Sequence, residues 1–203
     1  MIITILLIAM LPFVTKEPDP SLQTGIRIIR DLPYVPGSVD ENQTLDLFIP
    51  KTKFGTSLPL IIWIHGGGWI EGDKSSSPSL ELARKGFATA SINYRLAPKN
   101  LFPAQIYDCK AAIRFIRAHA EEYNIDPDRI GVWGHSAGGH LAALLGTTND
   151  IKELEGDLGN LDRSSATSAV CDWCGPTNLL TFKEQCPPDV SMGDISPPEL
   201  VDM

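Results

Sequence analysis

The chain has 203 residues, of which 43% are hydrophobic and 21% are charged, a composition ordinary for one soluble domain with a sizeable core. The net charge is -8 at pH 7 and no basic patch is visible, which excludes a nucleic-acid partner and favours a small-molecule one. The apolar stretch at the N-terminus is shorter than the roughly 20 residues that a membrane span needs, so we expect no membrane span.

Residues 1–14 are apolar apart from Thr4 and Pro12, and a polar, proline-containing stretch follows them. This length is typical of the apolar region of a secretory signal peptide, although a basic region before it and an Ala-x-Ala cleavage site are lacking. A misplaced start codon or a buried N-terminal strand is the alternative. We interpret residues 1–15 as a signal peptide and expect a secreted or periplasmic protein, with a cytoplasmic protein as the alternative.

Four cysteines would suit one or two disulfides in an exported protein: Cys109, Cys171, Cys174 and Cys186. Cys171 and Cys174 have C-x-x-C spacing, but a zinc site needs a second pair of ligands, and none is suitably spaced. We therefore interpret the cysteines as structural, and we expect neither a metal nor a cofactor.

The first half of the chain predicts an outer pair of strands and two inner ones. Apolar side chains recur at residues 25–30 and 44–49, which we interpret as outer antiparallel strands of a larger sheet. A continuous apolar run at residues 58–64 predicts a strand covered on both faces, and residues 87–93 predict another. A short helix is expected between them, at residues 77–85.

The second half continues the alternation of helices and strands. A helix is expected from residue 104 to about residue 123, and His119 continues its apolar stripe as a packed side chain rather than a catalytic base. Residues 126–128 predict a turn, and residues 129–133 and 168–173 predict two more strands. This order predicts an α/β fold with a mostly parallel sheet and right-handed crossovers.

A Gly-x-Ser-x-Gly turn lies between the strand expected at residues 129–133 and an alanine-rich helical segment. Gly134 and Gly138 lack a Cβ, so the backbone can turn sharply enough to expose Ser136. A serine hydroxyl needs such exposure, together with a base and an oxyanion site, to act as a nucleophile. The N-terminus of the following helix directs N–H groups toward the developing negative charge. We therefore predict Ser136 as the catalytic nucleophile.

A His-Gly-Gly-Gly-Trp stretch at residues 65–69 directly follows the buried strand at residues 58–64. Successive glycines cost chain entropy and usually mark a place where backbone approaches a ligand closely, with a flexible loop as the alternative. A glycine-rich loop after a core strand and a nucleophile turn form a mechanistic pair. The loop is therefore predicted to form an oxyanion hole.

These residues resemble the α/β-hydrolase superfamily, and within it the esterases that pair a His-Gly-Gly-Gly loop with a Gly-x-Ser-Ala-Gly-Gly turn. The matching pieces are residues 65–69, 72–74, 94–98, 102–104, Asp108 and residues 134–141, in the same order as in the superfamily. The version here is more similar to the feruloyl and acetyl-xylan esterase-like branch than to hormone-sensitive lipases. The resemblance implies an α/β-hydrolase fold with helices on both faces of the sheet, and a serine carboxylester hydrolase.

The resemblance also implies a role for each site residue. Ser136 would attack the ester carbonyl, and the backbone N–H groups of Gly67, Gly68 and Ala137 would bind the tetrahedral oxyanion. Two-step acyl transfer follows, in which the alcohol leaves and water then releases the acid.

Around these groups, Trp69 would line the acyl or alcohol pocket, and His65 and Asp73 would hold the loop in shape. The substrate would be a small-molecule or polysaccharide-linked ester: an acetylated or feruloylated polysaccharide, a short-chain lipid ester or, in a related reaction, a formyl amide. The residues of the glycine loop do not choose between these substrates.

The triad of this superfamily runs Ser, then Asp or Glu, then His along the chain. All four histidines precede residue 141, so none is placed as the general base. The acid is expected after a seventh strand, with Asp172 as the alternative in a minority arrangement of this fold. Because the family has eight strands, we expect residues 22–203 to be the N-terminal part of one domain, with the last strands, the acid and the histidine beyond Met203. The alternative function is a non-catalytic α/β-hydrolase-like binding protein.

Overall fold

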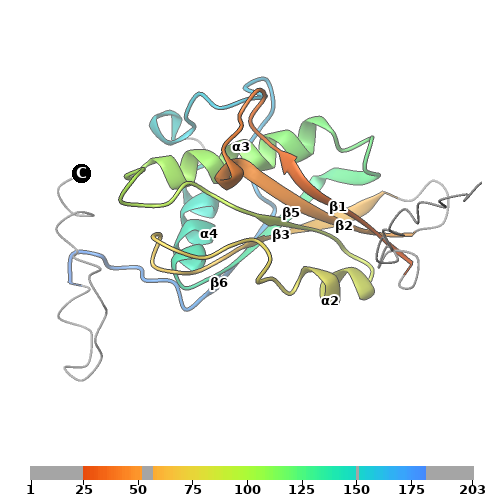
Figure 1. Ribbon diagram of the computed structural model, residues 1–203, viewed down its shortest axis with the longest axis horizontal. Helices are drawn as coiled ribbons and strands as arrows, with labels where there is room; N and C mark the ends of the chain where they lie inside the picture. Colours follow the sequence, from red (N-terminus) through yellow and green to blue (C-terminus); the bar gives the residue numbers. More distant parts are fainter. Residues whose placement is uncertain (1–24, 52–56, 150, 182–203) are drawn as a thin grey trace, which may run out of the picture.

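A computed structural model describes residues 25–51, 57–149 and 151–181 of the chain. Within them, six strands form one mixed sheet in the order β1-β2-β4-β3-β5-β6 (Figure 1). The strands are β1 (Ile26–Pro33), β2 (Thr44–Pro50), β3 (Leu58–Ile64), β4 (Ala88–Ile92), β5 (Ile125–His135) and β6 (Ala169–Trp173). β2 runs antiparallel to both β1 and β4, whereas β4, β3, β5 and β6 are parallel. The predicted α/β fold with a mostly parallel sheet is confirmed.

Helices cover both faces of this sheet. They are α2 (Ser79–Arg84), α3 (Ala104–Ala118) and α4 (Ala137–Thr147), with short 3-10 turns η1 (Glu41–Gln43) and η2 (Lys152–Leu154). α2 packs against β2 and β4, whereas α4 packs against β5 and β6 beside α3 (Figure 1). Right-handed crossovers account for this division, because the chain moves from β3 to β4 in one direction across the sheet and returns toward β5 and β6 in the other. No helix in the described part of the chain is long and apolar enough to cross a membrane.

Two predicted boundaries differ from the structure. The helix expected to reach residue 123 ends at Ala118, because the chain turns at Asn124, whose φ is 55°, and the N–H of Ile125 returns to the carbonyl of Ala120. The prediction of a turn at residues 126–128 before the strand is wrong, because these residues lie inside β5. The Asp-Pro-Asp sequence instead interrupts the pairing, because the partner on β5 advances by five residues, to Ile130, while β3 advances by two.

Buried basic side chains of α3 hold the irregular segment that follows α4. The Lys110 ammonium donates to the Thr148 carbonyl at 2.7 Å and pairs with the Glu155 carboxylate at 2.6 Å. Arg114, which is 1% exposed, pairs with the same carboxylate at 3.0 Å and donates to the carbonyl of Leu158. These bonds satisfy both buried cations, and they fix a stretch of chain that has little regular structure of its own.

The cysteines are not joined in the part of the chain that the structure describes. Cys109 is a buried free thiol in α3, while Cys171 and Cys174 are exposed free thiols at the end of the sheet. Burial, and next the neighbouring Asp108 carboxylate, raise the pKa of the Cys109 thiol, which therefore packs as a neutral group. The predicted disulfides are thus absent among these three residues; Cys186 and the predicted signal peptide, residues 1–15, lie outside the described residues.

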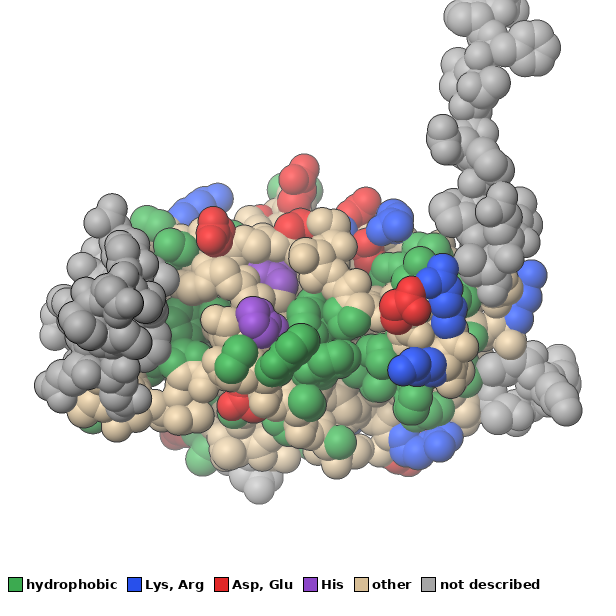
Figure 2. Space-filling model, turned by 90° about the horizontal axis from the view of Figure 1, so that it is seen from below, with side chains coloured by type: hydrophobic (Ala, Val, Ile, Leu, Met, Phe, Trp, Pro, Cys, Tyr) green, Lys and Arg blue, Asp and Glu red, His purple; other side chains and the backbone are tan. Residues whose placement is uncertain are grey.

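Tryptophans from three strands gather on the face of the sheet that carries α2. Trp63 is paired in register with Trp133, and Trp133 stacks on Trp173 with ring centroids 5.8 Å apart. The indole N–H of Trp63 donates to the Ser76 carbonyl, just before α2. Figure 2 views the molecule from the side opposite α3 and shows hydrophobic side chains gathered in the middle of this face, next to histidine side chains.

β6 is an edge strand of the described sheet. It pairs with β5 on one side, and each of its five residues is exposed. Its two large apolar side chains, Val170 and Trp173, are 42% and 54% exposed. Unpaired N–H and C=O groups along an edge strand are a template for pairing with another chain.

We therefore expect the chain to self-associate through β6, and Ala169→Lys to weaken this association because lysine on an edge strand opposes strand pairing. Val39→Lys is the matched control, since Val39 is 98% exposed in the connection between β1 and η1. Sedimentation velocity over a concentration series should show larger species for the unaltered chain and the Val39 variant than for the Ala169 variant. A chain that stays monomeric and unfolds cooperatively throughout would contradict the prediction.

Candidate active site

Ser136 lies at the junction of β5 and α4 with an unusual backbone conformation. Its φ of 53° and ψ of -119° are in a region that side-chain-bearing residues rarely adopt, at a cost of about 1–3 kcal/mol. The Ser136 N–H donates to the carbonyl of Trp173 at 2.9 Å, and the Ser136 carbonyl accepts from the N–H of His140 at 3.0 Å. The end of β6 and the first turn of α4 therefore hold this conformation from two sides.

Close backbone contacts explain the glycines around Ser136. A Cβ on Gly134 would lie 2.0 Å from the Gly138 carbonyl oxygen, and one on Gly138 would lie 2.1 Å from the Ile64 carbonyl oxygen. A Cβ on Gly66 would lie 3.2 Å from the Ser136 Cβ. The structure thus brings the end of β3 and the start of the glycine loop directly against the nucleophile turn. The sequence analysis had not singled out Gly66 within that loop.

Three backbone donors remain free where these segments meet. The N–H groups of Gly67, Gly68 and Ala137 make no hydrogen bond to any residue in the described ranges. Ala137 is the first residue of α4, so its N–H has no partner within the helix. Gly67 and Gly68 have φ values of 109° and 58°, of which the first is accessible to almost no other residue. The site therefore offers unpaired donors from a helix N-terminus and a glycine loop.

His65 begins the glycine loop and is packed rather than free. Its ring stacks on Tyr94 with centroids 4.3 Å apart, and its Nδ1 lies 2.8 Å from the Gly66 carbonyl oxygen. The Tyr94 hydroxyl donates to the His65 carbonyl at 3.0 Å. Burial lowers the pKa of His65, although the Gly66 carbonyl and the Asp73 carboxylate act in the opposite direction.

Asp73 lies at the other end of the loop and is tied to β4's C-terminal end. Its carboxylate accepts from the Asn93 side-chain amide at 3.1 Å and from the Ser75 N–H at 2.7 Å. The Asn93 side-chain oxygen in turn accepts from the Lys74 N–H at 2.7 Å. Burial alone would raise the pKa of Asp73, but the hydrogen bonds from Ser75 and Asn93 outweigh it, so the pKa lies below its usual value. The carboxylate is therefore engaged in holding backbone.

Lys74 connects the loop to the antiparallel end of the sheet. Its ammonium lies 2.6 Å from the Asp31 carboxylate and 2.8 Å from the Asp46 carboxylate, and Arg30 also pairs with Asp46. Burial would lower the pKa of Lys74, but the hydrogen bonds to the two carboxylates raise it above its usual value. β1 and β2, which supply no residue to the site itself, therefore fix the end of the glycine loop.

Trp69 is 5% exposed and belongs to the main hydrophobic core. Its carbonyl accepts from the N–H of Ala97 at 2.9 Å, and its ring meets the ring of His140 edge to face, with centroids 5.2 Å apart. The predicted role in an acyl or alcohol pocket stays a prediction. What the structure adds is that Trp69 packs between the 94–103 segment and α4.

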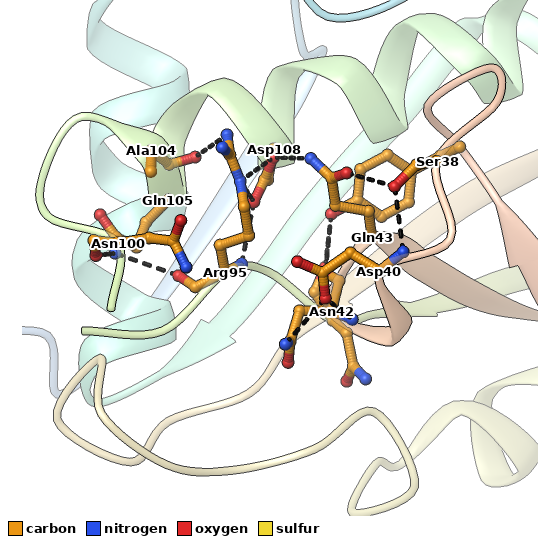
Figure 3. Close-up of polar contacts among 11 residues, drawn as sticks. Ser38, Asp40, Asn42, Gln43, Arg95, Asn100, Ala104, Gln105 and Asp108 are labelled. Carbon is orange, nitrogen blue, oxygen red and sulfur yellow. Dashed lines mark hydrogen bonds and ion pairs between the residues drawn. The ribbon is translucent and has the colours of Figure 1, made fainter. Parts of the chain in front are cut away.

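A buried carboxylate of α3 holds the segment that contacts Trp69. Asp108 is fully buried and accepts from the Arg95 N–H and Nε, each at 2.8 Å, and from the Gln43 side-chain amide at 2.9 Å (Figure 3). Gln105 donates to the carbonyls of Arg95 and Asn100 from the same helix. The motif match included Asp108 but gave it no role, and Gln43 and Asn93 carried no sequence signal beyond being polar.

The rings of the four histidines contact groups other than the Ser136 hydroxyl. The Nδ1 of His119 lies 2.8 Å from the Phe115 carbonyl oxygen, and the ring of His135 meets the ring of Trp173 edge to face. Together with the packed His65 and His140, this leaves no histidine ring hydrogen-bonded to the Ser136 hydroxyl within residues 25–51, 57–149 and 151–181.

Asp172, the candidate acid, is engaged with backbone. Its Oδ1 accepts from the Gly175 N–H at 2.7 Å and lies 2.4 Å from where a Gly139 Cβ would be. It therefore fastens the chain after β6 to the first turn of α4, and it makes no hydrogen bond to a histidine in the described part of the protein. In the same part, no three potential metal ligands gather into a group.

Comparison with known proteins assigns this arrangement to a family. The family model described as BD-FAE matches residues 45–197, which include the glycine loop, the nucleophile turn and β6. The chain belongs to the BD-FAE family. The expected resemblance to α/β-hydrolase esterases is thereby confirmed.

Relatives of this BD-FAE chain include curated proteins and solved structures. It is 42% identical over 141 residues to "Probable carboxylic ester hydrolase LipM" of Mycobacterium tuberculosis, which covers 66% of this chain and 32% of LipM. It matches a bifunctional GH43-CE protein of Bacteroides eggerthii with 38% identity and a TM-score of 0.71, over 75% of this chain and 21% of that one. A truncated carbohydrate esterase from gut microbiota matches with 38% identity and a TM-score of 0.68, over 77% and 59% of the two chains. The chain spans about a third of the length of the curated relatives that it matches.

Gly138→Ala should destabilise the fold by about 1–3 kcal/mol, because its Cβ would overlap the Ile64 and His65 carbonyl oxygens. Gly131→Ala in β5 is the matched control, since its Cβ would have its nearest neighbours at an ordinary 3.6 Å. Urea denaturation followed by circular dichroism gives both free energies of unfolding. Equal midpoints for the two variants would contradict the close contact.

His65 should make the protein less stable as the pH falls. Because burial lowers the pKa of His65 in the folded chain, the unfolded chain binds more protons below about pH 6.5, so stability is full above that pH and declines beneath it. His65→Gln should reduce the difference between the urea midpoints at about pH 7.5 and about pH 5.5. An unchanged difference would show that His65 does not contribute to it.

Proposed function

We propose that the chain carries the nucleophile and the oxyanion-binding groups of a serine carboxylester hydrolase, with Ser136 as the nucleophile. The observation that carries the proposal is the left-handed backbone of Ser136 at the strand-to-helix turn, held against a glycine loop with free N–H donors. Backbone strain of this kind persists where the surrounding structure enforces it, and it gathers at functional sites. The names of the relatives, which include esterases and carboxylic ester hydrolases, support the same activity.

The proposed reaction begins when the Ser136 Oγ attacks the ester carbonyl carbon and its proton passes to a general base, which later protonates the leaving alcohol. The carbonyl oxygen becomes an oxyanion that accepts hydrogen bonds from the N–H groups of Gly67, Gly68 and Ala137. The C–O bond to the alcohol then breaks, the alcohol leaves with a proton, and water releases the acid from the acyl-enzyme. Loss of one such donor is expected to lower turnover about a hundred- to a thousandfold.

The proposed substrates are esters on small molecules or polysaccharides. A solved relative named as a carbohydrate esterase supports a carbohydrate ester as the substrate, and an acetyl or feruloyl ester of a polysaccharide is the proposed form. In this proposal Trp69 contributes to the acyl or alcohol pocket, and His65 and Asp73 hold the loop. A secreted or periplasmic location would suit a polysaccharide substrate and remains part of the proposal.

A non-catalytic binding protein is the second candidate, and one observation favours it. No histidine is hydrogen-bonded to the Ser136 hydroxyl in the described part of the chain, so no histidine there is in position to accept its proton. We therefore expect slow hydrolysis of activated short-chain esters by the 203-residue chain.

A fluorophosphonate probe tests whether Ser136 is a nucleophile. The unaltered chain and Ser57→Ala, which removes an exposed serine hydroxyl, should each be labelled at one residue, identified as Ser136 by mass spectrometry. Ser136→Ala should not be labelled, because it lacks the attacking oxygen.

Added imidazole then tests for the missing base. If the oxyanion site is functional, imidazole should accelerate p-nitrophenyl acetate hydrolysis by the unaltered chain beyond the rate that it gives with Ser136→Ala. A folded chain that is neither labelled nor rescued would overturn the esterase proposal in favour of a binding protein. Fast hydrolysis without imidazole, abolished by Ser136→Ala, would show that a base is already present.

A further inference from the structure

His140 occupies a place in the site that the proposed reaction leaves unexplained. It is the fourth residue of α4, and its N–H donates to the Ser136 carbonyl, so its position is tied to that of the nucleophile. Its side chain meets the ring of Trp69, in the glycine loop, edge to face at an interplanar angle of 89°. His140 thus joins α4, which begins directly after Ser136, to the loop that carries Gly67 and Gly68.

The surroundings of His140 suit a neutral ring. Its Nδ1 is buried and has no hydrogen-bond partner among the described residues. A charged imidazolium would have both ring nitrogens as donors, and a buried donor without an acceptor is costly. Burial lowers the pKa of His140, while the Asp172 carboxylate acts in the opposite direction. The Asp172 carboxylate accepts from the Gly175 N–H and makes no hydrogen bond to the His140 ring among the described residues.

The partner ring, Trp69, has little freedom to move on its own. Its backbone has a φ of 62°, its carbonyl accepts from Ala97, and its side chain is 5% exposed. Directly after it, the N–H groups of Ile70 and Glu71 both donate to the Gly67 carbonyl, at 3.1 Å and 3.0 Å. A displacement of the Trp69 ring therefore moves the turn that sets the direction of the Gly67 and Gly68 N–H groups.

We infer that His140 is a positioning residue for the oxyanion-binding loop, acting through the Trp69 ring as a neutral imidazole that keeps the loop in register with Ser136. The inference deepens the proposed function and rests on it for its catalytic meaning. The contact itself is a property of the folded chain, so it can be tested without any measurement of catalysis.

Amide hydrogen exchange, measured by NMR on the full chain, reports on the loop directly. His140→Leu removes the aromatic ring and should raise the exchange of the Ile70 and Glu71 amides about three- to tenfold, the effect of losing one edge-to-face pair. His140→Phe keeps a ring in place and should restore the unaltered rates at neutral pH. The amide of Ile62, in the middle of β3, reports global opening and should not change.

Two matched controls separate His140 from its neighbours. His135→Gln removes the other histidine of the nucleophile turn, whose ring meets Trp173 rather than Trp69, and should leave the loop amides unchanged. Trp69→Phe identifies the Trp69 component of the tryptophan fluorescence by difference. That component should be quenched as His140 becomes protonated in acid, because an imidazolium is a stronger quencher of indole than neutral imidazole is.

The pH dependence of loop exchange tests whether the contact with Trp69 requires the neutral form of His140. Protonation of His140 opposes its contact with Trp69, so the contact should be present near pH 7.5 and weaken as the pH falls toward about pH 5.5. Amide exchange in the loop of the unaltered chain, corrected for its intrinsic pH dependence, should therefore rise over the same range. The other titratable groups near the loop all remain in His140→Phe: His65, Glu71, Asp73, Lys74, His135 and Asp172. The pH profile of this variant should therefore be shallower than that of the unaltered chain and should keep only the contribution of these other groups.

The outcomes decide the inference. Unchanged loop exchange in His140→Leu, a loop response to His135→Gln, or a pH profile in His140→Phe as steep as in the unaltered chain would each overturn it. If His140→Leu also raises exchange at Ile62, the decision rests on the pH profile of His140→Phe. Failure of fluorophosphonate labelling at Ser136 would remove the proposed function but would not alter any of these readouts.

Discussion

The backbone contact between the end of β3 and the turn at residues 134–138 is the constraint on which the rest of the site depends. At that contact Gly138 lies against the Ile64 and His65 carbonyls, and Gly66 lies against Ser136, with no side chain between them. Because interiors are close-packed, even one added methyl group would separate the two segments. The strained conformation of Ser136 and the position of the free donors both follow from this approach.

A backbone contact of this kind has to be held in place from outside, because glycines themselves contribute no packing. The structure supplies that support through polar groups on neighbouring elements. Asn93 binds both Asp73 and the Lys74 backbone, and Asp108 fixes the segment whose Ala97 N–H holds Trp69. Each of these buried groups has its hydrogen bonds satisfied, so each stabilises one geometry of the loop rather than a range of them.

The positions of all six strands along the chain, and the Gly-x-Ser-x-Gly turn between a strand and a helix, could be predicted from the sequence, because periodicity and glycine patterns are local signals. The sequence-based prediction missed the end of α3 and the continuation of β5 through residues 126–128, because these depend on pairing with β3 rather than on local preference. The contacts of Asp108, Lys74 and Asn93 could not be predicted from the sequence either. A polar residue in a sequence does not reveal which distant backbone group it will satisfy, and each of these bonds spans about 13 or more residues of chain.

Lys74 links the antiparallel part of the sheet to the loop that follows its parallel strands. The parallel strands carry the nucleophile turn and the glycine loop, yet the loop ends on carboxylates of the β1–β2 hairpin. A protein assembled from β3 onward would keep Ser136, its glycines and its free donors, but would leave an ammonium group with no counter-charge at the exit of the loop. The β1–β2 hairpin and the parallel strands therefore depend on each other, and recombination between them would remove the carboxylates that hold the end of the glycine loop.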